Sequence, residues 1–279
     1  MENPIAHGIY TISDREFKLF QELIYRETGI FLPAEKKLLL VSRLSKRLRA
    51  LGLSNFSRYY DYLHASPDTA QELIMMINRI TTNKTDFFRE PHHFEYLKNE
   101  LFPQFKRDNQ KNIRIWSAGC STGEEAYSLA LTVAEIFGEK PVEDIKILAT
   151  DLDTSVLEWA EKGIFTPERV TPIPKLLLAK YMSKLNDGSW EIKTTIKRMI
   201  YFRRLNLITP KFPFTHGFDI IFCRNVLIYF KKEDRFALIE KLHSVLRENG
   251  CLFLGHSESL LNNNLGFQLL RNTIYRKSS

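Results

Sequence analysis

The residues best suited to hold a small polar ligand lie at the ends of two apolar stretches. The turn GCSTG, residues 119–123, separates an apolar stretch from a helical one. A glycine turn between a strand and a helix places backbone N–H groups where a small polar ligand binds. The stretch ILATDLD ends in Asp151 and Asp153, and an acidic residue at such a strand end can accept hydrogen bonds from both hydroxyls of a ribose. The pattern predicts an adenosine-containing ligand.

The form of the turn narrows the choice of ligand. NAD and S-adenosyl-L-methionine (SAM) both carry the ribose, but the turn lacks the G-x-G-x-x-G pattern that lets a helix approach a pyrophosphate. The chain also lacks G-x-x-x-x-G-K-[ST], which argues against a P-loop nucleotide site. SAM has a ribose and no phosphate, so it fits best. The alternative is a turn without a ligand, followed by an Asp that caps a helix.

Metal and disulfide chemistry are not indicated. His92 and His93 are adjacent, so on a helix their side chains point about 100° apart, and no other His or Cys is placed to join them. We expect no metal. The three cysteines, at positions 120, 223 and 251, are far apart and lie in or beside apolar runs. They read as small core residues.

Composition limits the class of protein. The chain has 279 residues, of which 44% are hydrophobic, enough for a large domain with a small companion. No window approaches the roughly 20 apolar residues of a membrane span, and MENPIAHGIYTIS has no basic region followed by an apolar run, so we expect a cytoplasmic protein. The net charge of +7 and the pI near 9.2 favour an acidic partner: nucleic acid, a membrane surface or an acidic protein.

Residues 1–82 are predicted to form a helical N-terminal domain. Ser13 and Glu16 form a capping-box pattern before a helix that ends at Gly29. A second helix, in residues 35–52, buries leucines on one face and carries a basic cluster on a neighbouring one. The cluster consists of Lys36, Arg43, Lys46 and Arg47.

Residues 83–279 are predicted to form an α/β domain. From about residue 111, short apolar runs alternate with helical ones, which indicates a doubly wound, mostly parallel, Rossmann-like sheet with helices on both faces. Residues 164–203 are predicted to form an inserted β-subdomain in which WEIK pairs with MIYFRR. Ligands of such sheets bind beyond the carboxyl ends of the strands, where the glycine turn lies.

Several motifs together resemble one protein family. TTNKTDFFRE (81–90), STGEEAYSLA (121–130) and FDIIFCRNVLIYF (218–230) are similar, in order and spacing, to segments of the chemotaxis receptor methyltransferases of the CheR type. ATDLD, GHSES and the basic helix RLSKRLRALG extend the resemblance over nearly the whole chain. It implies SAM-dependent O-methylation of glutamate side chains on the cytoplasmic helices of chemoreceptors, which tunes adaptation, with S-adenosyl-L-homocysteine as the other product.

The resemblance also implies roles for individual residues. Asn83, Thr85 and Arg89 would face the methionine end of SAM. Glu125 would hold the methionyl amine and Asp151 the ribose. Asn206 and Leu207 would lie at the adenine, and Arg224 and Asn225 would line the floor of the site. Arg89 and Tyr229 are the residues we expect to act on methyl transfer itself. Taken singly, each has a structural alternative, such as a surface ion pair, a turn cap or a core aromatic.

The basic helix and the insertion bear on the acceptor. The resemblance implies that the helix meets the acidic methylation region of receptor helices, whereas a charge run is otherwise a solvated face. The hairpin segment KLNDGSWEIK looks shorter than in family members that bind a C-terminal receptor tail peptide, so binding of such a peptide is doubtful here. We expect a monomer. Two other classes remain: a nucleic acid methyltransferase, for which no stacking surface or separate module is found, and a non-catalytic adaptor that binds SAM.

Overall fold

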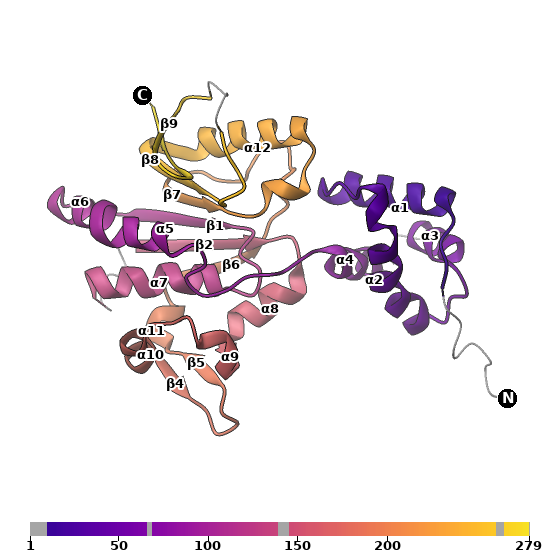
Figure 1. Ribbon diagram of the computed structural model, residues 1–279, viewed down its shortest axis with the longest axis horizontal. Coiled ribbons are helices and arrows are strands. Elements are labelled where there is room, and N and C mark those ends of the chain that lie inside the picture. Colours follow the sequence, from indigo (N-terminus) through magenta and orange to yellow (C-terminus); the bar gives the residue numbers. More distant parts are fainter. Residues whose placement is uncertain (1–9, 66–68, 139–144, 261–264, 279) are drawn as a thin grey trace. The chain divides into compact units, whose positions relative to one another are not determined.

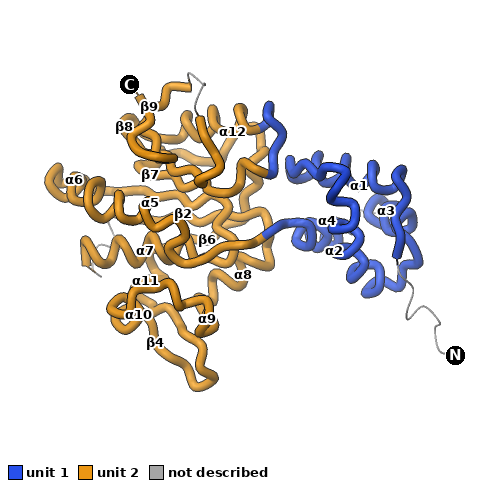
Figure 2. Tube along the Cα trace, viewed as in Figure 1, with its two compact units in different colours: residues 1–82, 229–234 blue, residues 83–228, 235–279 orange. Residues whose placement is uncertain are grey.

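The computed structural model describes residues 10–65, 69–138, 145–260 and 265–278. The chain divides into two compact units (Figure 2): unit 1 comprises residues 1–82 and 229–234, and unit 2 comprises residues 83–228 and 235–279. Residues 229–234, which the sequence places in the second domain, belong to unit 1. The first nine residues, considered above for a leader sequence, lie outside the described part. Across the described ranges, no helix combines the length and the apolar character that a membrane crossing requires.

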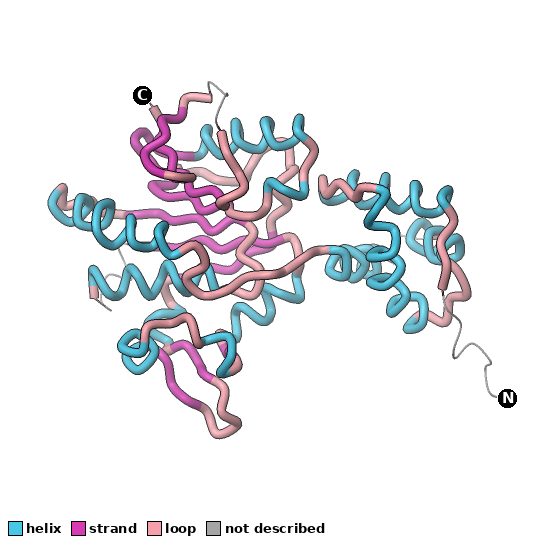
Figure 3. The backbone as a smooth tube through the Cα atoms, viewed as in Figure 1, coloured by secondary structure: helices cyan, strands magenta, loops and turns pink. Residues whose placement is uncertain are grey.

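The described residues of unit 1 form helices joined by loops (Figure 3). Its helices are α1 (Asp14–Thr28), α2 (Lys37–Ala50), α3 (Phe56–His64) and α4 (Ala70–Ile80). The predicted capping box is confirmed, since Ser13 accepts from the backbone of Glu16 while the Glu16 carboxylate accepts from the backbone N–H of Ser13. Gly29 ends α1 in the left-handed conformation, with φ of 73°. Local sequence signals therefore set the first helix.

The core of unit 1 comes from the apolar faces of these helices. Leu40, Leu44 and Leu48 of α2 are fully buried, as the helical spacing predicts. Phe20 of α1 stacks on Tyr59 and meets Phe56 edge to face. Burying one such side chain contributes about 1.5–3 kcal/mol, so packing rather than helix propensity holds the unit together.

Unit 2 contains a seven-stranded sheet in the order β6-β2-β1-β7-β8-β10-β9 within the described residues. β6, β2, β1, β7 and β8 run parallel, and β10 is antiparallel to both β8 and β9. The strands are β1 (Ile113–Ala118), β2 (Ile145–Asp151), β6 (Ile200–Arg204), β7 (Phe218–Cys223), β8 (Leu246–Leu254), β9 (Phe267–Arg271) and β10 (Ile274–Lys277). The order reverses beside β1, so the sheet is doubly wound as predicted, and this reversal marks the place for a ligand.

One predicted strand pairing is wrong. WEI, in β5 (Trp190–Ile192), pairs with β3 (Ile164–Phe165) and β4 (Met182–Lys184) in a separate three-stranded antiparallel sheet. IYFRR is β6 of the large sheet, where it runs parallel to β2 from Ile200 opposite Ile147 to Arg204 opposite Asp151. Alternating apolar residues allow either pairing. IYFRR takes the parallel one, which the long connection between β2 and β6 makes possible.

In unit 2, the first helices precede β1 and the later ones lie between strands in the sequence (Figure 1). They are α5 (Pro91–Tyr96), α6 (Phe102–Arg107), α7 (Glu124–Phe137), α8 (Thr154–Lys162), α9 (Pro167–Val170), α10 (Lys175–Tyr181), α11 (Thr194–Lys197) and α12 (Lys232–Val245), whose first three residues belong to unit 1. α7 follows the glycine turn and is buried from Glu124 to Ala134. A helix covered this thoroughly gives the turn at its N-terminus a rigid base.

Candidate active site

The glycine turn after β1 requires glycine at both ends. Gly119 and Gly123 have φ of +83° and +96°, which side chains rarely adopt. A Cβ atom on Gly119 would also lie 2.6 Å from Cγ2 of Val226, and one on Gly123 would lie 2.9 Å from Cβ of Ala160. The N–H groups of Gly119 and Cys120 donate to the carbonyl of Thr150 at 2.8 and 2.9 Å. The turn is thereby tied to the carboxyl end of β2.

Asp151 ends β2 directly beside this turn. Its carboxylate accepts from the backbone N–H of Ser121 at 2.8 Å and from that of Asp153 at 3.0 Å. Burial raises the pKa of Asp151, although these hydrogen bonds act to lower it. Among the described residues no cationic side chain pairs with it. Each oxygen retains accepting capacity, which fits the two hydroxyls of a ribose.

Asp153 has a different role from Asp151. It is fully buried and caps α8, accepting from the backbone N–H groups of Ser155 and Val156 at 2.9 and 3.3 Å. The side-chain amide of Asn83 donates to its other oxygen at 2.8 Å. The helix-capping alternative is thus correct for Asp153, and Asn83 is held by it.

Glu125 lies in the first turn of α7, and two donors from neighbouring strands hold its carboxylate. The hydroxyl of Ser117 in β1 donates to Oε1 at 2.7 Å, and Nε of Arg224, after β7, donates to Oε2 at 2.8 Å. The three residues meet because β1 and β7 are neighbours in the sheet. Carboxylate oxygens accept more than one hydrogen bond each, so Glu125 can also accept from an amine.

Arg224 organises a buried network. Its side chain is only 2% exposed, and Nη1 donates to the carbonyl of Arg89 at 2.6 Å and to Nδ1 of His93 at 3.0 Å. A guanidinium only donates, so Nδ1 of His93 accepts, and its proton lies on Nε2, 3.1 Å from Oγ1 of Thr273. Burial and the charge of Arg224 lower the pKa of His93 to about 2. His93 is therefore a neutral support for Arg224.

This network also argues against a metal at Glu90, His92 and His93, whose candidate ligand atoms lie within 4.8 Å of one another. The lone pair of Nδ1 of His93 accepts from Arg224. Nη1 of Arg224 also lies 3.8 Å from Oε2 of Glu90. Burial acts to raise the pKa of Glu90, but the charge of Arg224 and the hydrogen bonds from His256 outweigh it, so the pKa is lowered. A guanidinium already supplies the positive charge that a metal would bring.

Two family descriptions match nearly the whole chain. Residues 83–276 match "CheR methyltransferase, SAM binding domain", and residues 15–81 match "CheR methyltransferase, all-alpha domain". The chain belongs to the CheR methyltransferase family. Unit 2 is accordingly a SAM-dependent methyltransferase domain, and SAM is its cofactor. The carboxylates of Asp151 and Glu125, both next to the glycine turn, offer acceptors that suit the hydroxyl and amine donors of that cofactor.

Relatives in three bacteria support the same assignment. The chain is 43% identical to a chemotaxis protein methyltransferase of Borreliella burgdorferi over 257 residues, covering 90% of each chain. It is 38% identical over 271 residues to chemotaxis protein methyltransferase 2 of Pseudomonas aeruginosa, covering 95% of this chain and 93% of that one. It is 37% identical over 270 residues to a chemotaxis protein methyltransferase of Salmonella typhimurium, covering 96% of this chain and 91% of that one.

The remaining predicted residues lie at several places in the family fold. Nη1 of Arg89 donates to the carbonyl of Lys84 at 3.0 Å, and the residue is partly exposed, as is Thr85. Oδ1 of Asn206 accepts from the backbone N–H of Ile208 at 3.2 Å, and Leu207 is buried. Tyr229 belongs to unit 1, where its carbonyl accepts from Phe31 at 2.8 Å. Its role in methyl transfer stays a prediction.

Sequence reasoning assigned no role to Glu258, in the motif GHSES. This buried carboxylate accepts from the backbone N–H groups of Asn225 and Gly255 at 2.8 and 2.7 Å. Burial raises its pKa, against the effect of these hydrogen bonds. Asn225 has a positive φ of 58°, so Glu258 holds the loop after β7 in an uncommon conformation. The signal in the sequence was an acidic residue, in the motif GHSES, to which no ligand had been assigned.

The four basic residues of unit 1 do not form one free surface. Arg47 forms a two-point ion pair with the buried Glu72, in which Nε donates to Oε1 at 2.9 Å and Nη2 contacts Oε2. Arg43 donates to the carbonyls of Ile80 and Thr81, the latter at 2.9 Å. Lys36 and Lys46 are exposed. Two of the predicted substrate-binding residues are therefore engaged inside unit 1.

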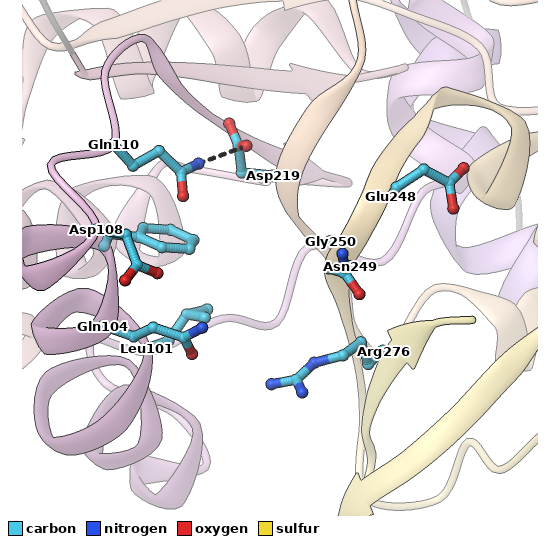
Figure 4. A pocket seen from close by; sticks show the side chains of 10 residues that line it. Leu101, Gln104, Asp108, Gln110, Asp219, Glu248, Asn249, Gly250 and Arg276 are labelled. Carbon is cyan, nitrogen blue, oxygen red and sulfur yellow. Dashed lines mark hydrogen bonds between the residues drawn. The ribbon is translucent and has the colours of Figure 1, made fainter. Parts of the chain in front are cut away.

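A pocket of about 310 Å³ lies at the opposite edge of the sheet (Figure 4). It is lined by residues that precede β1, by Asp219 near the start of β7, by the early part of β8 and by Arg276 at the end of β10. These are the amino ends of the parallel strands, whereas the glycine turn and Asp151 lie at the carboxyl ends. The pocket is not the candidate SAM site.

Proposed function

We propose that this protein transfers the methyl group of SAM to glutamate side chains on the cytoplasmic helices of chemoreceptors, forming γ-glutamyl methyl esters that tune adaptation. The observation that carries the proposal is the carboxyl-edge constellation of Glu125 and Asp151 in a chain whose two units both match the CheR family. The relatives named above are chemotaxis protein methyltransferases. A receptor acceptor would place the reaction in the cytoplasm.

The residues divide into ligand contacts and supports. Asp151 accepts from the ribose hydroxyls and Glu125 from the methionyl amine. Arg224 supports Glu125 directly, and Asn83 bonds the carboxylate of Asp153, whose backbone N–H donates to Asp151. We therefore expect Arg224 and Asn83 to act on SAM affinity largely through position. The other proposed contacts are Thr85 and Arg89 at the methionine end, Asn206 and Leu207 at the adenine, and Asn225 on the floor.

The chemistry needs no general base. SAM supplies a methyl group on a sulfonium centre, and the acceptor carboxylate is already ionised at neutral pH. Because attack of an anion on a sulfonium cancels two charges, water stabilises the reactants more than the transition state, and a site that excludes water accelerates the step. Arg89 would grip the incoming carboxylate with parallel N–H groups, and Tyr229 would orient it. Alignment supplies much of the remaining acceleration.

The decisive experiment uses SAM labelled on its methyl group and a receptor cytoplasmic fragment. Alkali should release the label as volatile methanol, because methyl esters hydrolyse under conditions that leave N-methyl and thioether groups intact. Label that is bound but never transferred would support the adaptor alternative. Transfer that resists alkali would show an acceptor other than a carboxylate, and either result contradicts the proposal.

The exposed lysines of unit 1 give a test of receptor docking. We predict that Lys36→Glu with Lys46→Glu lowers the rate of receptor methylation about tenfold at low salt while SAM affinity is unchanged, because like charges now face the acidic receptor segment. Arg47→Glu is the contrasting variant: it places a carboxylate against buried Glu72 and should unfold unit 1. An equal loss of SAM affinity in the lysine variant would show that the lysines do not act through docking.

The short strands of the inserted sheet bear on the receptor tail. A tail peptide that adds a strand needs an exposed edge, and the edge strands here, β3 and β4, have two and three residues. We predict that a receptor fragment without its C-terminal tail is methylated as fast as the intact fragment. A large drop in rate would show that the tail is used. The monomeric state stays a prediction.

A further inference from the structure

The inserted segment contacts the glycine turn through Arg169, in α9. Nη2 of Arg169 donates to Oγ1 of Thr122 at 2.6 Å and forms an ion pair with Oε1 of Glu124. Oγ1 of Thr122 in turn donates to Oε2 of Glu124 at 2.7 Å. Thr122 belongs to the turn, and Glu124 precedes the proposed SAM ligand Glu125. The insertion thus reaches the residues between the two parts of the cofactor site.

Glu124 is an acidic residue in an unusual environment. Its side chain is 1% exposed, and Arg169 is its cationic partner among the described ion pairs. Burial raises the pKa of Glu124, and Thr122 and Arg169 act in the opposite direction. A buried carboxylate that loses its partner is strongly destabilising unless it takes up a proton or moves toward water. Movement of Glu124 would displace the first turn of α7, which carries Glu125.

Arg169 is itself held in place by aromatic packing. Its guanidinium lies over the ring of Phe165, 5.8 Å from the centroid. Phe165 meets Phe87 edge to face at 4.8 Å and Tyr127 of α7 at 5.7 Å. Phe87 lies in the TTNKTDFFRE segment and Tyr127 lies one turn beyond Gly123. The same cluster therefore joins the insertion to two segments of the proposed SAM site.

We propose that Arg169 is a positioning residue for the cofactor: it neutralises Glu124, holds Thr122 in the turn and so keeps Glu125 in its binding geometry. The inserted β-subdomain then sets cofactor affinity without touching the cofactor. This inference rests on the proposed placement of SAM at the glycine turn. It assigns to the insertion a function that is independent of any receptor tail.

The test measures binding of S-adenosyl-L-homocysteine by calorimetry, which requires no acceptor. Arg169→Ala should raise the dissociation constant about tenfold, less than a fully buried pair would give because the Arg169 side chain is 38% exposed. Glu124→Gln should bind within about twofold of the parent, because it removes the charge and retains an acceptor for Thr122. Arg198→Ala, an exposed arginine in the same insertion, should bind like the parent.

The double variant separates positioning from general damage. If Arg169 acts by neutralising Glu124, Arg169→Ala combined with Glu124→Gln should recover an affinity close to that of Glu124→Gln alone, because no uncompensated charge remains. Thermal unfolding of each variant monitors the fold. An Arg169→Ala affinity equal to the parent's, or a double variant as weak as Arg169→Ala, would overturn the inference.

A second control separates this inference from the proposed function. Asp151→Asn should weaken binding of the same ligand if SAM lies at the glycine turn. If Asp151→Asn binds like the parent, the proposed site itself is wrong. If Asp151→Asn binds weakly and Arg169→Ala binds like the parent, the site stands and only the role of Arg169 is lost.

Discussion

Each of the two edges of the large sheet carries a carboxylate, and the two carboxylates differ in their hydrogen-bond and ion-pair partners. Asp219, at the amino edge, accepts from Nε2 of Gln110 at 2.8 Å, from the backbone N–H of Arg114 at 2.7 Å and from Nη1 of Arg247 at 2.9 and 2.8 Å. Asp151, at the carboxyl edge, accepts from the backbone N–H groups of Ser121 and Asp153, and in the described part of the chain no cationic side chain pairs with it. The first charge is neutralised by a side-chain cation, and the second is not.

This contrast distinguishes a structural carboxylate from a binding one. An ion pair and several hydrogen bonds satisfy the carboxylate of Asp219. This residue therefore stabilises the fold, and it lines the pocket in Figure 4. Asp151 carries an unneutralised charge at the reversal of strand order, which costs stability until a ligand donates to it. The pocket lies at the amino edge, whereas the carboxylate that we propose to bind the ribose lies at the carboxyl edge.

The largest expected effect that tests the contrast is at Asp151. Asp151→Asn should weaken binding of S-adenosyl-L-homocysteine by about a hundredfold, because hydrogen bonds to a charged acceptor contribute about 1.5–3 kcal/mol each. Thermal stability should stay the same or rise, since a buried charge is removed. Calorimetry and thermal unfolding measure both quantities. A variant with normal affinity but a lowered melting temperature would show that Asp151 is the structural carboxylate.

The matched variant at the amino edge should do the opposite. Asp219→Asn should lower the free energy of unfolding by about 2 kcal/mol, because it leaves Arg247 without its partner while Arg247 retains partial access to water. Affinity for S-adenosyl-L-homocysteine should stay within about twofold of the parent's. Denaturant unfolding and calorimetry check the two values. Weakened binding in a stably folded variant would show that the two edges are coupled.

A third prediction concerns the pH dependence of stability at the carboxyl edge. The pKa of His93 is lowered from its usual 6.5 to about 2, so below pH 6.5 the unfolded chain takes up a proton that the folded chain does not. The stability that His93 contributes is present above pH 6.5 and is lost as the pH falls toward 2, by up to about 1.4 kcal/mol per pH unit. Denaturant unfolding between pH 6.5 and 4.5 should show a shallower loss for His93→Gln. Equal slopes would mean that His93 is protonated in the folded protein.

Local patterns were sufficient for the elements and for part of the site. The capping box of Ser13 and Glu16, the glycine turn and the acidic end of β2 are signals carried by a few consecutive residues, and each appears in the structure where the sequence indicates it. His93 and Glu258 could not be found in this way. Their partners, Arg224 and Asn225, lie 131 and 33 residues away, and only the folded sheet brings them together.

The sequence by itself determined the helical unit, the mostly parallel sheet and the family, because helix caps, apolar periodicity and motif spacing are properties of neighbouring residues. Tertiary structure alone decided that β6 joins the large sheet, that Arg47 serves Glu72 rather than a free surface, and that Asp153 caps a helix while Asp151 remains available. The physical reason is that a charged side chain, or a strand with alternating apolar residues, can pair with several other parts of the chain. Which pairing forms depends on the residues that bury it, and these are distant in the sequence.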